Sequence, residues 1–252
     1  MRWLWIVLGL HSIIPAMGYS TPVAVHTKTS DGYHLVWNDE FRQSGSLNNW
    51  NIQDWASDKN NEWQYYSPEN VTVSDGFLKI TSKRERLKGR TYTSGAVTTQ
   101  HIFSFQYGKV EIRAKLPKGQ GVFPAFWLVT EQKKKWLPEI DMMENLGHEP
   151  NVVHQVVHWI DKNGRQQRDY SKYTSETDYS EDFHRFGLIW EKDKITWTVD
   201  DQKVFETTKF SPSQPLFLYM NTAIGGNWPG DPNPKDAYPK EMLIDYVRIY
   251  QK

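Results

Sequence analysis

Apolar and polar side chains alternate over short stretches from Tyr33 onward, and turn residues separate these stretches at frequent intervals. In the clearest stretch, from Lys109 to Leu116, Val, Ile, Ala and Leu alternate with Lys, Glu and Arg. This period of two places the apolar side chains on one face of a β-strand. Asp75-Gly76, between two such stretches, predicts a tight hairpin turn. Further strands are predicted at residues 35–37, 71–73, 77–80, 186–190, 195–199, 203–205, 216–224 and 242–250.

The pattern contains no convincing long amphipathic helix, internal repeat or low-complexity linker. Evenly spaced short strands with turn signals are typical of a sandwich. We therefore predict an all-β domain of two packed, curved antiparallel sheets. The polar, turn-rich stretches at 50–67, 83–92, 161–182 and 225–240 are predicted to be loops at the sheet edges. Long loops on a rigid scaffold usually carry the binding surface.

The N-terminus has a different pattern. Met1-Arg2 precede an apolar run, and the small residues around Gly18 provide a cleavage site. This pattern predicts a signal peptide at 1–18, a short leader at 19–32 and one domain at 33–252. The alternative is a buried N-terminal helix. The run is too short to span a membrane, so we expect a secreted, periplasmic or cell-surface protein without a membrane span.

Composition narrows the classes of partner. The chain has 30 basic and 30 acidic residues and a pI near 7.1, which argues against nucleic acid. Aromatic residues make up 14%, with 12 Trp and 13 Tyr, and such rings both pack in cores and stack on sugars. Cysteine is absent, so a sizeable core rather than disulfides has to stabilise an exported protein.

Three carboxylates lie within six residues, at Glu139, Asp141 and Glu144. On a regular strand Glu139 and Asp141 share a face, whereas Glu144 points to the other one. A β-bulge at Met142-Met143 would return all three acids to one face. Glu139 and Glu144 would then lie roughly 13 Å apart along the backbone. On a concave sheet their side chains could approach to about 5–5.5 Å, the separation that a retaining glycosidase uses.

Such a pair can divide the work of glycoside cleavage. One ionised carboxylate attacks the anomeric carbon, while the other, still protonated, donates its proton to the leaving oxygen. Two nearby carboxylates do not both ionise easily, so their pKa values separate. Asp141 lies between them and can hydrogen-bond the nucleophile. This reaction requires no cofactor.

The same residues allow two other kinds of site. The acids together with His148, His154 and His158 could bind a metal, but the acids have strand spacing and no His-x-x-x-His lies on a recognisable helix. A serine hydrolase would need a Gly-x-Ser-x-Gly turn, which is absent. His158 is expected on a neighbouring strand facing the acids, and a hydrogen-bonded structural histidine is the alternative.

Ordered motifs extend over roughly residues 33–251. They are LVWNDEF from Leu35, NNEWQYY from Asn60, YTSGAV from Tyr92, FSFQYGKVEIRAKLP from Phe103, GVFPAFWLV from Gly121, Glu-x-Asp-x-x-Glu from Glu139, GHEP from Gly147, FHRFGLIW from Phe183, NTAIGGNWPG from Asn221 and IDYVRIY from Ile244. Together they resemble glycoside hydrolase family 16, of the laminarinase (endo-β-1,3-glucanase) type. The acidic signature has the bulged form rather than the unbulged lichenase form.

The resemblance implies a jelly-roll sandwich with an open substrate cleft on its concave face. It implies an endo-acting, retaining hydrolase of β-1,3-containing glucans, either laminarin or mixed-linkage β-1,3/1,4-glucan. Glu139 would be the nucleophile, Asp141 its electrostatic assistant and Glu144 the acid/base. The residues expected to contact the polysaccharide are Asn60, Asn61, Trp127, Trp136, His158, Asn221 and Trp228. A monomer is expected.

Members of this family often hold a structural calcium on the convex side. The matching positions are Glu40, the backbone of Gly76, and Asp245. Asp245 lies in an otherwise apolar strand, which fits a ligand and equally fits a buried, hydrogen-bonded Asp.

The chain departs from the family pattern at three places. Ala96 stands where laminarinases commonly have Arg, Phe123 where they have Trp, and the segment from Trp136 to Glu139 is short. All three are expected to border the non-reducing subsites, so the sugar stays open. The alternatives are another β-linked polysaccharide, such as a galactan, and a catalytically silent glycan-binding sandwich. A silent module would be expected to have lost at least one acid.

Overall fold

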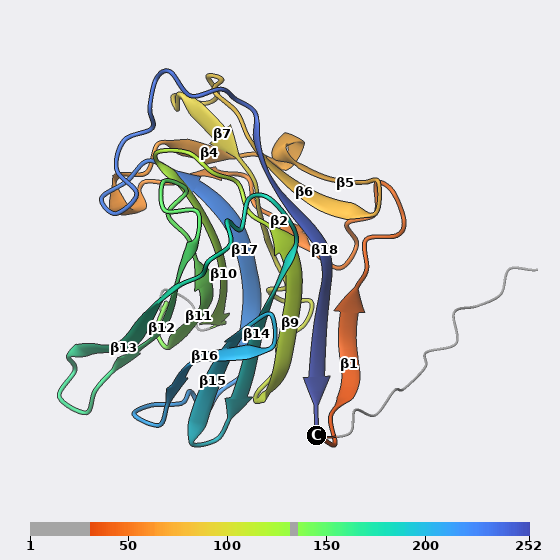
Figure 1. Ribbon diagram of the computed structural model, residues 1–252, viewed down its shortest axis with the longest axis vertical. Helices are drawn as coiled ribbons and strands as arrows, with labels where there is room; N and C mark the ends of the chain where they lie inside the picture. The colour runs from red at the N-terminus through yellow and green to blue at the C-terminus, as the bar shows by residue number, and fades with distance from the viewer. Residues whose placement is uncertain (1–30, 132–135) are drawn as a thin grey trace, which may run out of the picture.

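Two curved β-sheets pack face to face in the computed structural model, which describes residues 31–131 and 136–252 (Figure 1). The first sheet has the order β16-β15-β14-β9-β18-β6-β5, and β1 also pairs with β18. Its strands are β1 (His34–Asp39), β5 (Val71–Ser74), β6 (Phe77–Ser82), β9 (Gly108–Lys115), β14 (His184–Glu191), β15 (Lys194–Val199), β16 (Gln202–Thr207) and β18 (Lys240–Gln251).

The second sheet has the order β13-β12-β11-β10-β17-β8-β2. Its strands are β2 (Asn51–Ile52), β8 (Ala96–Thr98), β10 (Val122–Thr130), β11 (Glu139–Glu144), β12 (Val152–Ile160), β13 (Gln166–Thr174) and β17 (Leu216–Ile224). A small third sheet has the order β3-β4-β7, formed by β3 (Trp55–Ala56), β4 (Gln64–Tyr66) and β7 (Tyr92–Ser94). The predicted all-β sandwich is confirmed.

The core lies between the two large sheets. Strand β9 contributes Val110, Ile112 and Ala114, all fully buried, and its intervening charged side chains lie on the other face. The alternation in the sequence is therefore a true inside–outside pattern. Strand β17 is buried along its whole length because both of its faces are covered. One face joins the core, and the other lies beneath aromatic rings described below.

Several local predictions are confirmed. The β5–β6 hairpin turns at Asp75 and Gly76, whose φ values are +57° and +82°. This left-handed conformation suits a two-residue hairpin turn and explains the Asp-Gly pair. Strands β14, β15 and β16 form consecutive hairpins, as expected. Among the described residues, helix is limited to two short 3₁₀ segments, η1 (Lys59–Asn61) and η2 (Pro68–Asn70).

Two of the predicted loops are wrong in part. The stretch 161–182 contains β13, and the stretch 50–67 contains β2, β3 and β4. Strand β13 is an edge strand with no fully buried side chain. Its sequence therefore shows no apolar alternation from which a strand could be predicted. The three short strands lack the length that a period-two pattern needs. The predicted loop at 225–240 contains no strand or helix before Lys240, where β18 begins, so that prediction is confirmed except for its last residue.

The predicted signal peptide and most of the leader lie outside the described residues. Within the described ranges, none of the helices has the length and apolar character needed to cross a membrane.

Candidate active site

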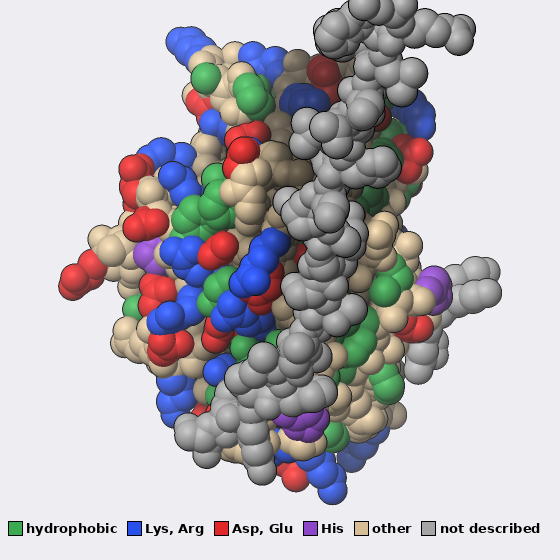
Figure 2. Space-filling view, turned by 90° about the vertical axis from the view of Figure 1, so that its right-hand side faces the viewer, with side chains coloured by type: hydrophobic (Ala, Val, Ile, Leu, Met, Phe, Trp, Pro, Cys, Tyr) green, Lys and Arg blue, Asp and Glu red, His purple; other side chains and the backbone are tan. Residues whose placement is uncertain are grey.

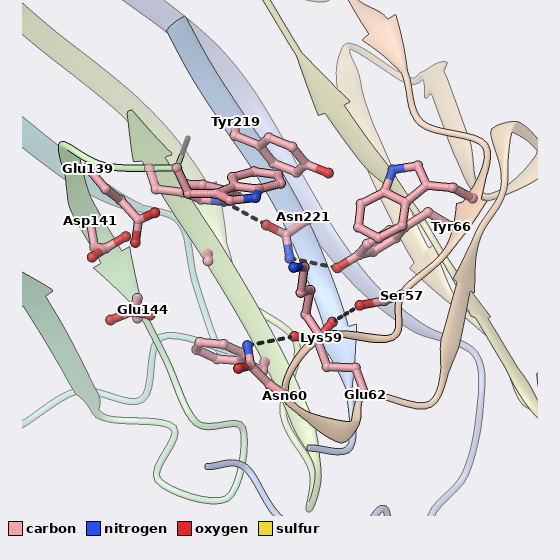
Figure 3. A pocket seen from close by; sticks show the side chains of 15 residues that line it. Ser57, Lys59, Asn60, Glu62, Tyr66, Glu139, Asp141, Glu144, Tyr219 and Asn221 are labelled. Carbon is pink, nitrogen blue, oxygen red and sulfur yellow. Dashed lines mark hydrogen bonds between the residues drawn. The ribbon is translucent and has the colours of Figure 1, made fainter. Parts of the chain in front are cut away.

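The predicted bulge is present in β11. Phe126 of β10 pairs with Met143 and Trp127 pairs with Asp141, so Met142 is passed over. On the other side, β12 has one residue between the partners of Asp141 and Glu144, whereas β11 has two. The extra residue shifts the alternation by one position. Glu139, Asp141 and Glu144 consequently line the same cavity (Figure 3).

The apolar residues of this strand explain why the bulge forms here. Ile140, Met142 and Met143 all belong to the core and are 0%, 3% and 0% exposed. Burying two successive methionines on the same side is incompatible with a regular strand, in which neighbours point to opposite faces. The bulge lets both methionine side chains pack in the core and leaves the flanking acids on the cavity side.

Burial perturbs all three carboxyls. Removal from water raises the pKa of Glu139 to about 7, while its hydrogen bond with Asp141 acts in the opposite direction. The pKa of Glu144 rises to about 8, first through desolvation and then through the charge of Glu139. Burial and both neighbouring acids hold the pKa of Asp141 well above its ordinary value. The charge of an ionised Glu139 thus favours the protonated form of Glu144.

His158 faces the acids, as predicted. Its Nε2 atom lies 3.5 Å from Oδ2 of Asp141. Burial and the nearby charge of Arg168 lower the pKa of His158, so the ring is neutral at neutral pH. Among the described residues, one group of side chains could hold a metal ion, Glu139, Asp141 and His158, with ligand atoms within 4.8 Å of one another. That group coincides with the acidic site itself.

The cavity beside the acids has a volume of about 280 Å³. Aromatic rings from distant parts of the chain form its wall. The Trp127 ring stacks on Tyr219 with centroids 4.4 Å apart, and Trp136 lies against Trp127 at 5.7 Å. Asn221 holds this wall in place. Its side-chain oxygen accepts a hydrogen bond of 2.9 Å from Trp127 Nε1, and its amide donates to the Tyr66 hydroxyl at 3.0 Å (Figure 3).

A second hollow of about 520 Å³ adjoins the first. The two share Glu144, Asn60, Glu62 and Phe123, so together they form one cleft with the acids near its middle. Trp228 lines the second hollow and is 45% exposed, with its ring 4.8 Å from that of His154. Such exposed rings at a cleft wall suit stacking on sugars.

Most of the residues expected to contact polysaccharide lie in this cleft. Asn60, Trp127, Trp136 and Asn221 line the first hollow, and His158 and Trp228 line the second. Asn61 lines neither. It is exposed, and its amide donates a hydrogen bond of 2.8 Å to Asn227.

The three departures from the family pattern differ in position. Phe123 and Trp136 line the cleft, but Ala96 is fully buried among the Tyr66 and Tyr219 rings and lines neither hollow. The expectation that Ala96 itself borders a subsite is therefore wrong, because aromatic side chains cover this small residue.

The structure also adds cleft residues that sequence reasoning missed. Trp55, Tyr66 and Tyr219 line the first hollow, with Lys59 and Glu62. Glu62 accepts hydrogen bonds from Ser57 at 2.6 Å and Gln64 at 2.7 Å, which fixes it at the rim (Figure 3). A signal existed for Tyr219, which precedes Asn221 by two residues and so shares its face of the strand.

The predicted calcium ligands lie on the first sheet and its turns, away from the cleft. Figure 2 faces this side of the molecule, where acidic and basic side chains lie beside one another. Glu40 accepts two hydrogen bonds from Arg248, at 2.8 and 2.9 Å, and Asp245 pairs with Arg113. Both carboxylates are neutralised by guanidinium groups, so this donor set does not fit a calcium ion.

The sandwich with a carboxylate pair in an aromatic-lined cleft defines a polysaccharide-processing protein of the glycoside hydrolase class. Comparison with known proteins makes the assignment specific. The sequence profile of glycosyl hydrolases family 16 matches residues 49–248, and the chain belongs to that family.

Known relatives cover most of the chain. The β-glucanase of Rhodothermus marinus is 35% identical over 87% of this chain and 85% of its own length. The laminarinase catalytic domain from Thermotoga maritima has a TM-score of 0.80 at 35% identity, covering 87% of this chain and 98% of that one. A structure from work on the endo-acting O-glycanases with which human gut microbiota initiate mucin breakdown has a TM-score of 0.81 at 32% identity, covering 89% of this chain and 92% of that one.

Proposed function

We propose that this family 16 hydrolase cleaves β-1,3-containing glucans, laminarin or mixed-linkage β-1,3/1,4-glucan, with retention of configuration. The observation that carries the proposal is the bulge in β11, which brings Glu139 and Glu144 to one wall of the cleft, where burial raises the pKa of both carboxyls. The Rhodothermus and Thermotoga relatives support the choice of glucan.

The proposed reaction has two steps. Glu139 in its ionised form attacks the anomeric carbon, while Glu144 transfers its proton to the departing glycosidic oxygen. This breaks the glycosidic bond and leaves a glycosyl ester on Glu139. Glu144, now ionised, takes a proton from water, whose oxygen attacks the same carbon and releases Glu139. Two displacements on one carbon restore the β configuration.

Asp141 and His158 act on the nucleophile rather than on the sugar. Asp141 is only 4% exposed, and the coupling between its carboxyl and Glu139 lowers the pKa of Glu139. A protonated Asp141 can thus donate a hydrogen bond to ionised Glu139 and withdraw negative charge from it before the attack. The neutral ring of His158 lies 3.5 Å from Oδ2 of Asp141 and borders that carboxyl on the side of β12.

The cleft favours internal cleavage. Hollows lie on both sides of the acids and share Glu144, so a polysaccharide can extend past the reacting bond in both directions. A pocket closed at one end would instead restrict attack to chain ends.

The test is incubation of the purified chain with laminarin and with barley mixed-linkage glucan, using Glu139→Gln as the control. Oligosaccharides released by the wild type and not by the variant support the proposal. Proton NMR of the first product should show the β anomer, and an α product excludes the mechanism. Activity should persist in EDTA, because the proton transfers require no metal. Inactivity on every polysaccharide tried, with binding kept, identifies a silent glycan-binding sandwich instead.

A second substrate class has specific support. The O-glycanase structure resembles this chain as closely in fold as the laminarinase does, with TM-scores of 0.81 and 0.80. Phe123, which lines both hollows, also stands where laminarinases commonly have the larger Trp. The same two-step chemistry would then act on a galactan or another β-linked glycan. Adding agarose, keratan and mucin glycans to the panel separates the two, since release from these alone overturns the glucan proposal.

We further propose that the protein is exported and that residues 1–18 are removed. The support is the apolar run after Met1-Arg2 and the small residues near Gly18. N-terminal sequencing of the protein recovered outside its host cell tests this, and an intact Met1 contradicts it.

A further inference from the structure

Three rows of side chains cross the second sheet from the acids outward. The paired positions are Glu139–His158–Arg168, Asp141–Val156–Tyr170 and Glu144–His154–Lys172, on β11, β12 and β13. Residues that pair directly across neighbouring strands point to the same face of a sheet. The outermost strand therefore presents Arg168, Tyr170 and Lys172 on the face that carries the acids. Arg168 lies two strand spacings from Glu139, roughly 10 Å.

This edge belongs to the cleft. Arg168 and Tyr170 line the second hollow together with Glu144, His154 and Trp228. Tyr170 is 59% exposed, which is unusual for a large aromatic side chain at a strand position. Together Arg168 and Tyr170 offer a cation beside an open ring.

The cations of β13 differ in their partners. Lys172 pairs with Glu149 at 3.1 Å. Arg168 has no carboxylate within ion-pair distance among the described residues, and its guanidinium lies 5.0 Å from the Tyr170 ring centroid. The acid next to it in sequence, Asp169, points to the opposite face and pairs with Lys209 at 2.7 Å. Arg168 thus keeps all its donors available on the cleft side.

We propose that Arg168, supported by Tyr170, binds an anionic substituent, a sulfate ester or a carboxylate, on a sugar that lies on the β12–β13 side of the acids. A guanidinium matches both oxyanions with paired hydrogen bonds. A neutral glucan would leave this cation without a counter-charge. An anionic sugar would otherwise be repelled by the ionised nucleophile, and Arg168 offsets that repulsion. The proposal rests on the hydrolase function above and adds the charge of its substrate.

The test compares laminarin with lightly sulfated and lightly carboxymethylated laminarin. The ratio of kcat/KM on each derivative to kcat/KM on neutral laminarin is measured for the wild type and for Arg168→Gln. Arg165→Gln is the matched control, because it removes the same charge three residues away, from a side chain 72% exposed that does not line the cleft. Urea unfolding of each variant verifies the fold.

The ratio is expected to fall about tenfold or more in Arg168→Gln, the size expected for loss of a charge-assisted hydrogen bond, and to stay unchanged in Arg165→Gln. If Arg168→Gln lowers the ratio on both derivatives, the site recognises negative charge in general. If it lowers the ratio on only one, that derivative identifies the oxyanion as sulfate or carboxylate. In the wild type, raising NaCl to about 1 M should also weaken the preference, because the screening length shrinks to about 3 Å. Equal ratios for Arg168→Gln and the wild type overturn the proposal.

A binding measurement separates this inference from the hydrolase function. In a Glu139→Gln background, binding of the three glucans is followed by tryptophan fluorescence, since Trp228 lines the same hollow. If no glucan is hydrolysed but the derivatives bind and Arg168→Gln weakens that binding about tenfold, the anion site stands and the glucanase function fails. If the wild type hydrolyses glucan and neither the kcat/KM ratio nor the binding depends on Arg168, the glucanase function stands and the anion site fails. Absence of binding to any derivative also overturns the anion site.

Discussion

Replacing Glu144 by Gln should make the protein more stable at alkaline pH while abolishing hydrolysis. In the unfolded chain this carboxyl has its ordinary pKa of 4.5, whereas burial beside Glu139 raises the pKa to about 8 in the fold. Between these values the unfolded chain loses the proton and the folded protein keeps it. Stability therefore falls as pH rises through this window, and above about pH 8 the cost is constant. Gln resembles the protonated acid and does not titrate.

The magnitude follows from the size of the shift. A change from 4.5 to about 8 corresponds to ~5 kcal/mol at 1.36 kcal/mol per pH unit. Glu144 is partly exposed to the cleft, so solvent screens the interaction, and its titration is shared with Glu139 and Asp141. We therefore expect less than half, about 2 kcal/mol, as the gain of Glu144→Gln over the wild type at pH 8.5 relative to pH 4.5.

Urea unfolding at several pH values, followed by the fluorescence of the 12 tryptophans, measures this difference. Glu176→Gln, at an exposed position, controls for the loss of one negative charge. If the stabilities of the wild type and Glu144→Gln change in parallel from pH 4.5 to 8.5, burial does not hold the proton on Glu144. The assignment of Glu144 as the proton donor would then lose its physical basis.

Three further outcomes are expected. The kcat/KM on a soluble substrate should rise as pH approaches 7 and fall above 8, because Glu139 must be ionised and Glu144 protonated. A kcat/KM that stays level up to about pH 10 would contradict these roles. Asn221→Ala removes the hydrogen bonds of this amide to Trp127 and Tyr66, so the free energy of unfolding should drop by about 2–4 kcal/mol in urea. Unchanged stability would show that water replaces the amide. Deleting Met142 removes the bulge and turns Glu144 toward the core, so activity should fall at least about 100-fold. If the deletion variant stays active and circular dichroism verifies its fold, the bulge is not what brings Glu144 to the face of Glu139.

The strand content and the acidic site could both be predicted from local sequence. Side-chain alternation is a property of neighbouring residues, so stretches such as 109–116 identify themselves. The bulge could also be predicted from neighbouring residues, because a regular strand cannot bury two adjacent methionines and keep all three acids on the other face. The edge strand β13 could not be predicted, since a strand with no buried face carries no apolar pattern.

What only the tertiary structure decided is which distant residues meet. Sheet order places β17 beside β10, and this brings Asn221 to Trp127, 94 positions earlier in the chain. It also aligns Arg168 with His158 and Glu139 across three strands. Strand pairing depends on the burial of whole sheet faces rather than on adjacent residues, so neither alignment follows from the local pattern of residues. By itself the sequence determined the carboxylates, the chemistry they allow and, through the family resemblance, six further residues of the cleft. The packing of the sheets decided that Tyr66, Tyr219 and Arg168 also line it.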